Sequence, residues 1–185
     1  MVPGKAWGSA FSVLFLGLFS CGIVHADIVV YADFGGTWKY FPGLAEASSP
    51  DPTAWRSPEF DDSSWASGVA PFGYGRTPPY VTDLSTLKPP MRENYTTLFL
   101  RATFEVPDPA RVKRLTANAI FDDALVLWIN GQEVHRTAGT PIDEVIPFDA
   151  VSTRNHSGLA PVEVPLGDAS MLVPGTNTLA VHVLN

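Results

Sequence analysis

Apolar and polar positions are most sharply ordered in residues 121–136, which read FDDALVLWINGQEVHR. The run Ala124–Ile129 has no polar break. A strand that is apolar on both faces is covered on both faces, so we expect a central strand here. Asn130-Gly131 follows, and this dipeptide favours a type I′ hairpin turn because both residues tolerate positive φ. After the turn the chain is mostly polar, and Val134 alone is expected to point inward.

A second stretch, residues 96–106, alternates with a period of two, as a strand with two different faces does. One face carries Leu98, Leu100, Ala102, Phe104 and Val106, and the other carries Thr97, Phe99, Arg101, Thr103 and Glu105. Shorter β-prone runs lie at residues 27–32, 38–41, 69–74, 111–121, 162–166 and 178–184. Long Pro-, Gly- and Ser-rich loops separate them at residues 45–58, 76–94 and 138–155. The pattern predicts an all-β jelly-roll β-sandwich with almost no helix, formed as one domain by residues 27–185.

The composition of the chain argues against some classes of binding partner. The chain has 19 acidic and 12 basic residues, which gives a net charge of −7, and the basic residues do not cluster. Nucleic-acid binding is therefore not expected, because it needs a basic face. The sequence also contains no basic amphipathic helix of the kind that binds a membrane surface.

The first 26 residues have the pattern of a cleaved signal peptide. Lys5 precedes an uncharged apolar stretch at residues 10–24, and Val24 and Ala26 are the small residues expected before a cut at Asp27. The stretch is shorter than the ~20 residues of a spanning helix. A minor alternative is lipidation of Cys21, since LFSCG loosely resembles a bacterial lipobox. We expect a secreted or cell-envelope protein whose mature form carries no cysteine.

Five motifs occur in an order that resembles the galactose-binding-like jelly-roll modules of secreted bacterial proteins. They are FDDSSW, GVAPFGYG, LFLRATFEV, FDDALVLWINGQEVHR and PGTNTLAVHV, and the resemblance covers roughly residues 38–184. These modules are similar to the sugar-binding domains attached to β-galactosidases and other hydrolases. The resemblance implies a non-catalytic, carbohydrate-binding module. Two departures stand out: Ala124 replaces the usual glycine after Asp122-Asp123, and the family continues with a further strand after Leu184, so we expect a piece of a longer protein.

Candidate chemistry is sparse. Asp122-Asp123 could provide two oxygen ligands for Ca²⁺, but such a site needs more of them, so capping of a turn before the buried strand is the favoured interpretation. The histidines are dispersed, and His182 in the last apolar run is expected to be a satisfied sheet residue. No metal, cofactor or catalytic motif is recognisable, and we expect neither a cofactor nor an enzyme.

Aromatic residues in or beside loops are the better functional signal, because sugars stack on aromatic rings and bond to polar side chains. For these aromatics, core packing and ligand stacking are equally compatible with the sequence, whereas Trp38, Trp65 and Trp128 are expected in the core. The candidate ligand-binding residues are Trp55, Tyr74, Arg76, Tyr80, Asp122, Asp123 and Arg136. The sequence thus predicts carbohydrate binding or attachment of a larger secreted protein. The alternative is a structural spacer that packs against a neighbouring hydrolase domain.

Overall fold

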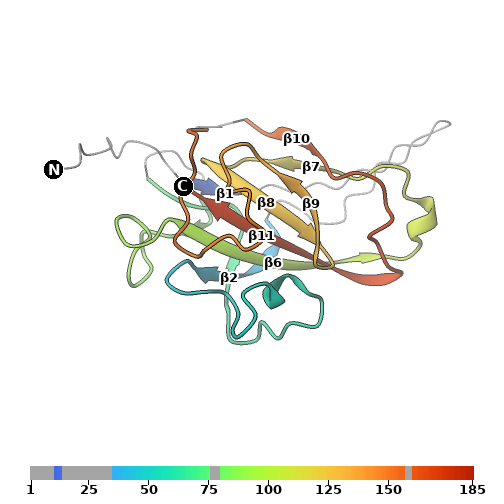
Figure 1. The fold of residues 1–185 in the computed structure, drawn as a ribbon, viewed down its shortest axis with the longest axis horizontal. Helices are drawn as coiled ribbons and strands as arrows, with labels where there is room; N and C mark the ends of the chain where they lie inside the picture. The colour runs from blue at the N-terminus through green and yellow to red at the C-terminus, as the bar shows by residue number, and fades with distance from the viewer. Residues whose placement is uncertain (1–10, 14–34, 76–79, 157–159) are drawn as a thin grey trace.

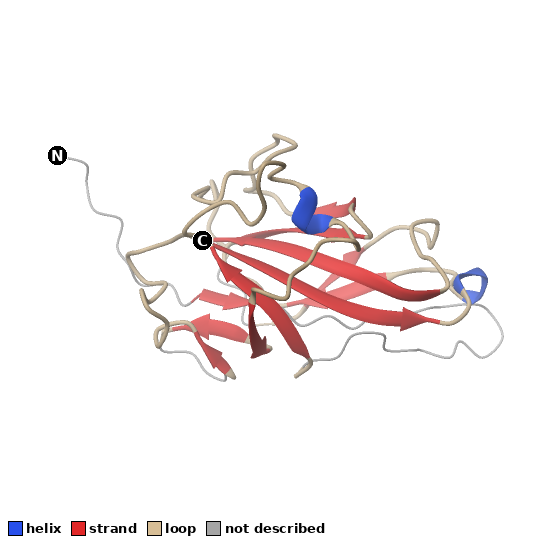
Figure 2. Cartoon of the chain, turned by 90° about the horizontal axis from the view of Figure 1, so that it is seen from below, coloured by secondary structure: helices blue, strands red, loops and turns tan. Residues whose placement is uncertain are grey.

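The computed structural model describes residues 11–13, 35–75, 80–156 and 160–185, and this part of the chain is an all-β sandwich (Figure 1). Its strands are β1 (Phe11–Val13), β2 (Thr37–Pro42), β3 (Ala66–Val69), β4 (Phe72–Tyr74), β5 (Thr82–Asp83), β6 (Thr97–Val106), β7 (Thr116–Ala119), β8 (Ala124–Ile129), β9 (Gln132–Arg136), β10 (Val162–Pro165) and β11 (Gly175–Leu184). The helical content described is two short 3-10 turns, η1 (Ala54–Arg56) and η2 (Pro109–Arg111), drawn blue in Figure 2. The predicted fold class is confirmed.

A six-stranded antiparallel sheet in the order β3-β2-β6-β11-β8-β9 forms the main layer. Its centre is β11, which pairs with β6 along ten residues and with β8 along six. Two smaller sheets, β10-β7 and β1-β4-β5, complete the fold. Near the centre of the sheet the long strands carry apolar residues on both faces. Both faces are therefore covered by other parts of the protein and not by water.

The inner face of the main sheet packs against β4, β7 and β10, and this layer holds the larger core. The face predicted for β6 is confirmed: Leu98, Leu100, Phe104 and Val106 are buried in that core. Alternate residues of β8 and β11 point to the same side, and Val134 of β9 packs against it as predicted. Burial of each such side chain stabilises the fold by roughly 1.5–3 kcal/mol.

The outer face of the main sheet is covered by loops rather than by a second sheet. Trp55 in η1 contacts Phe99 and Trp128 edge to face, with ring centroids 5.0 and 5.4 Å apart. We expected the loop at residues 45–58 to run over the surface, with Trp55 at the edge of the sandwich. Instead Trp55 is 1% exposed at the centre of a second core cluster, because this loop lies across the sheet. The turn containing Trp65 closes the cluster on one side.

The hairpin between β8 and β9 forms as its sequence predicts. Asn130 and Gly131 have φ of +50° and +82°, and all six residues of β8 are buried. Asn130 also fixes the turn to the rest of the sheet, since its side-chain oxygen accepts the backbone N–H of Thr178 and its amide donates to Asn177. These bonds join the hairpin to β11, a strand that lies far along the chain.

Gly131→Ala should lower the free energy of unfolding by about 1 kcal/mol, since alanine is strained at positive φ. A Cβ at this position would meet no atom closer than 3.8 Å, so the cost is conformational rather than steric. Urea unfolding of the variant measures it. A change below a few tenths of a kcal/mol would contradict the turn geometry.

One strand prediction is wrong in part, and another falls outside the described residues. The run at residues 69–74 is not one strand: it is divided at Ala70-Pro71 into β3 and β4, because Pro71 has no N–H to donate to a ladder. The predicted strand at residues 27–32 lies outside the described residues, as does most of the predicted signal peptide. Within that peptide, β1 is described and pairs antiparallel with β4, which places Phe11 opposite Tyr74.

His182 is in the sheet as expected, but it is not satisfied. It is fully buried on the outer face of β11 and stacks on Phe99 with a centroid distance of 4.0 Å. Neither ring nitrogen has a hydrogen-bond partner among the described residues. Burial lowers its pKa to about 3, with smaller contributions from the charges of Arg56 and Arg136. His182 is therefore neutral at physiological pH.

Candidate functional site

The fold brings together four of the candidate ligand-binding residues at one end of β8. Asp122 and Asp123 directly precede β8, Tyr74 ends β4, and Tyr80 lies just before β5. His156, directly after the loop at residues 138–155, joins them. We call these five residues the aspartate cluster. They come from segments as far as 82 positions apart, because the antiparallel layers return the chain to the same edge.

Asp123 fixes the backbone of this end of the sandwich. Its N–H donates to the carbonyl of Leu184 over 2.9 Å, and its Oδ1 accepts the N–H of His156 over 2.8 Å. The ring of His156 stacks on Phe121, with centroids 4.4 Å apart. Bonding of a loop amide is the role that we expected for the aspartates, and Asp123 fulfils it, although the amide belongs to a distant loop.

Asp122 behaves differently from its neighbour. Asp122 is 4% exposed. Its pKa is raised to about 7 by burial, by a hydrogen bond with the carboxyl of Asp123 and by the charge of Asp123. In its protonated form Asp122 is the donor in that bond. Its other oxygen, Oδ1, is buried and has no hydrogen-bond partner within the part of the chain that the structure describes. An unpaired buried polar group costs about 1–3 kcal/mol, so this oxygen calls for a partner.

The two tyrosines line the same end. The hydroxyl of Tyr74 accepts a bond of 2.8 Å from the side-chain amide of Asn185, and burial raises its pKa. Burial also raises the pKa of Tyr80, and the negative charge of Asp122 raises it further, which shows that the two groups are close. The hydroxyl of Tyr80 is buried and unpartnered among the described residues.

The aspartate cluster therefore presents three buried polar atoms for which the described residues provide no partner: Tyr80 Oη, Asp122 Oδ1 and His156 Nε2. Tyr80 and His156 are partly exposed, so the cluster has a solvent-facing side. A hydroxyl group both donates and accepts hydrogen bonds, and it can satisfy a carboxyl oxygen and a phenol at once. The arrangement suits a ligand rich in hydroxyls. No group of three residues suited to hold a metal ion is found among the described His, Cys, Asp and Glu side chains.

Comparison with known proteins finds similar solved structures but does not assign the chain to a family. No family model matches the chain, and no curated protein is significantly similar to it in sequence. Among solved structures it is similar to parts of β-glucuronidases from Bifidobacterium dentium (15% identity, TM-score 0.44, covering 100% of this chain and 21% of that one), Ruminococcus gnavus (17%, 0.48, 84% and 21%) and an uncultured Clostridium species (19%, 0.49, 86% and 24%). The chain thus spans between a fifth and a quarter of these proteins. At such TM-scores the likeness carries no argument about the site.

The remaining candidates lie away from the aspartate cluster. Trp55 is in the outer core cluster, where its ring is covered by other aromatic rings. Arg136 is on the edge strand β9 and bonds both carboxylate oxygens of Glu133, over 2.8 and 2.7 Å, as well as the carbonyl of Pro141. Arg76 is outside the described residues. The structure thus brings together the aspartates and tyrosines, and it places Trp55 and Arg136 elsewhere.

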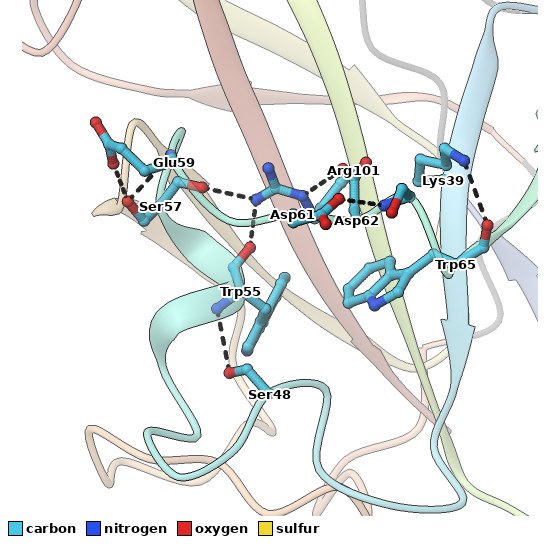
Figure 3. A network of polar contacts seen from close by, with 10 residues as sticks. Lys39, Ser48, Trp55, Ser57, Glu59, Asp61, Asp62, Trp65 and Arg101 are labelled. Carbon is cyan, nitrogen blue, oxygen red and sulfur yellow. Dashed lines mark hydrogen bonds and ion pairs between the residues drawn. The ribbon is translucent and has the colours of Figure 1, made fainter.

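Sequence reasoning missed a second polar group, drawn in Figure 3. Arg101, 3% exposed, donates from Nε to Asp62 over 2.7 Å and from Nη1 to the carbonyls of Trp55 and Ser57. Asp62 lies in a turn next to Asp61, whose Oδ1 accepts the N–H of Ser63. The sequence does contain a sign of this group, because Arg101 is a charged residue in the largely apolar and Thr-rich strand β6. An arginine that is buried in a strand requires hydrogen-bond acceptors.

Proposed function

We propose that this chain is a non-catalytic module of a larger secreted protein and that it binds carbohydrate at the aspartate cluster. The observation that carries the proposal is that the aspartate cluster contains three buried polar atoms, Tyr80 Oη, Asp122 Oδ1 and His156 Nε2, for which the described part of the chain provides no hydrogen-bond partner. Sugar hydroxyls supply donors and acceptors of the kind that these atoms lack. The partly exposed ring of Tyr80 adds a surface on which a sugar ring can pack.

The state of Asp122 supports a neutral ligand. With its pKa raised to about 7, Asp122 holds a proton in mildly acidic solution and shares it with Asp123. Its Oδ1 then acts as a carboxylic-acid acceptor for a hydroxyl, and no cation is needed to balance a buried charge pair. A hydroxylated, uncharged sugar residue is the ligand that this end of the sandwich accommodates.

Asp122→Ala should weaken binding of the retained glycan at least tenfold, since a hydrogen bond to a buried acceptor contributes roughly 1.5 kcal/mol or more. Asp122→Asn is the matched control: its amide oxygen can take the place of Oδ1 and its N–H₂ can donate to Asp123, so it should bind like the wild type at pH 6. A glycan array and polysaccharide pull-down with the whole chain identify the ligand. A chain shown to be folded by circular dichroism that is retained on no glycan would overturn the proposal.

The loop at residues 138–155 supports a second candidate function, because apolar side chains are exposed on it. Ile142 is 94% exposed there, and Val145 and Val151 are 39% and 51% exposed. Apolar side chains this open favour contact with another surface. The alternative proposal is a spacer that packs against a neighbouring domain through this loop. Hydrogen–deuterium exchange tests it: residues 141–151 should be protected in the longer protein relative to this chain, and equal exchange would contradict it.

Secretion remains part of the proposal. It rests on the signal-peptide pattern of residues 1–26, most of which lie outside the described residues. Among the helices that the structure does describe, none has the length and hydropathy to cross a membrane. Expression with and without residues 1–26 in a secreting host, followed by N-terminal sequencing of the exported chain, tests the predicted cut before Asp27.

A further inference from the structure

The outer face of the main sheet has a hollow of about 240 Å³ that is lined mainly by polar residues. Its walls come from β2, β3, β6 and β11 and from the turn that carries Asp62, and Figure 3 shows the polar contacts on its border. The lining residues are Thr37, Trp38, Lys39, Asp62, Ser67, Arg101, Ala102, Thr103 and Thr178. The hollow lies on the opposite face of the sheet from the core that contains Tyr74, so it is separate from the aspartate cluster.

The strand alternation explains why this part of the face is polar. Along β6, Phe99 points outward beneath Trp55, whereas Arg101 and Thr103 are the next outward positions. On β2 the outward side chains are Thr37 and Lys39, and the aromatic cover begins at Phe41, which contacts Trp65. The apolar cover therefore ends at one row of the sheet, and polar side chains continue beyond it.

One wall of the hollow is held rigidly. Arg101 makes its three bonds to Asp62, Trp55 and Ser57, and its guanidinium lies over the ring of Phe60 at 5.3 Å. The charges of Arg101 and Asp62 balance each other within this ion pair. A site whose wall is fixed before binding loses little conformational entropy when a ligand enters.

Lys39 is the cation of the hollow that forms no direct ion pair among the described residues. Its ammonium donates to the carbonyl of Trp65 over 3.3 Å, and an ammonium has three N–H donors. Hydrogen bonds from Ser63 lower the pKa of Asp61, and the positive charge of Lys39 lowers it further, so the exposed carboxylate of Asp61 lies near the ammonium without bonding to it. The hollow thus offers a cation in a chain of net charge −7.

We propose that this hollow binds one acidic sugar residue, with the anionic group on Lys39 and the ring hydroxyls on the hydroxyls of Thr37, Ser67 and Thr103. The ligand chemistry is a hydroxylated ring that bears a carboxylate or a sulfate ester. A free anion without hydroxyls would leave the threonine and serine groups unused. A neutral sugar would place no anion against the ammonium of Lys39. This second site goes beyond the proposed function, which concerns a neutral sugar on the other face.

The test is calorimetric titration of the whole chain with galacturonic acid, galactose 6-sulfate and galactose at low salt. Binding of either acidic sugar and none of galactose is expected at this site, and comparison of the two acidic sugars names the preferred anion. Lys39→Met should weaken the binding about tenfold or more, since a hydrogen bond to a charged group is lost. Lys88→Met, which removes an exposed lysine of the 76–94 loop, should leave it unchanged.

Two further variants keep the outcome clear. Thr103→Val, at an exposed position on the rim, removes a hydroxyl with little change in shape and should weaken binding severalfold even if Lys39→Met fails to fold. Asp122→Ala should leave acidic-sugar binding unchanged, so failure of the aspartate cluster and failure of the hollow are distinguishable. No binding of either acidic sugar, galactose binding that Lys39→Met weakens as much as acidic-sugar binding, or acidic-sugar binding that Lys39→Met and Thr103→Val both leave intact would overturn the proposal.

Discussion

Arg101→Met should lower the free energy of unfolding by about 3 kcal/mol, the low end of the cost of breaking a buried ion pair. The low end applies because the side chain of Asp62 is 26% exposed and water can partly solvate it once the arginine is gone. The carbonyls of Trp55 and Ser57 lose their donor in the same change. Since these groups attach the covering loop to the sheet, urea unfolding followed by tryptophan fluorescence measures the loss.

Two variants test whether the effect belongs to the ion pair. Asp62→Asn keeps an acceptor for Arg101 and removes only its counter-charge, so it should cost less than Arg101→Met, about 1–2 kcal/mol, since a charge-assisted hydrogen bond is weakened but not lost. Arg114→Met breaks a pair with Glu163 whose partners are 58% and 60% exposed, and it should change the stability by less than about 1 kcal/mol. If Arg101→Met cost no more than Arg114→Met, the loop would not depend on Arg101.

The second large effect is a cancellation in the pH dependence of stability. Asp122, whose pKa is raised to about 7, stabilises the folded state fully below its ordinary pKa of 3.8, and this contribution is lost as the pH rises toward 7. His182, whose pKa is lowered to about 3, contributes stability above its ordinary pKa of 6.5, and this contribution is lost as the pH falls toward 3. Between about pH 4 and 6.5 the two slopes are opposite, at about 1.4 kcal/mol per pH unit each.

Each single variant should expose the slope of the other group. Relative to the wild type, His182→Leu should lose stability as the pH rises from 4 to 6.5, because only the Asp122 term remains. Asp122→Asn should lose stability as the pH falls over the same range, because only the His182 term remains. Urea unfolding at half-unit steps of pH measures both, and the double variant should parallel the wild type. Parallel curves for all four proteins would contradict the pKa directions of these two groups.

Local features of the fold could be predicted from the sequence because their causes are local. The Asn130-Gly131 turn depends on two residues that tolerate positive φ, and the faces of β6 depend on alternation within one strand. The burial of β8 on both faces follows from its unbroken apolar run. Each of these properties is a function of neighbouring residues, so a single segment contains the information.

Features that depend on distant segments could not be predicted in the same way. The sequence shows Trp55 in a loop, but its burial depends on that loop crossing β6 and β8, which lie 40 or more residues further along the chain. Two acceptors of Arg101, the carbonyls of Trp55 and Ser57, lie in the same loop. His182 was expected to be satisfied, yet the outer face around it is lined by aromatic rings that offer no acceptor. Layer packing decides each of these outcomes.

The candidate site falls between these cases. Tyr74, Tyr80, Asp122 and Asp123 could be selected by residue type, because aromatic and acidic side chains are the groups that recognise sugars. Their meeting at one end of β8 requires the antiparallel topology, and the same topology separates Trp55 and Arg136 from them. The unpartnered atoms themselves become visible only when the hydrogen bonds of the folded chain are known.

Tyr80→Phe tests the central claim most directly, because it removes little more than one hydroxyl that has no hydrogen-bond partner among the residues described by the structure. In a chain where that hydroxyl serves a ligand, the variant should be as stable as the wild type or slightly more stable, since a buried group without a partner is gone. Its affinity for the glycan that the wild type retains should fall by about tenfold, the value of one hydrogen bond of 1.4 kcal/mol. Unfolding and calorimetric titration of the two proteins side by side give both numbers. Unchanged affinity with unchanged stability would contradict carbohydrate binding at the aspartate cluster.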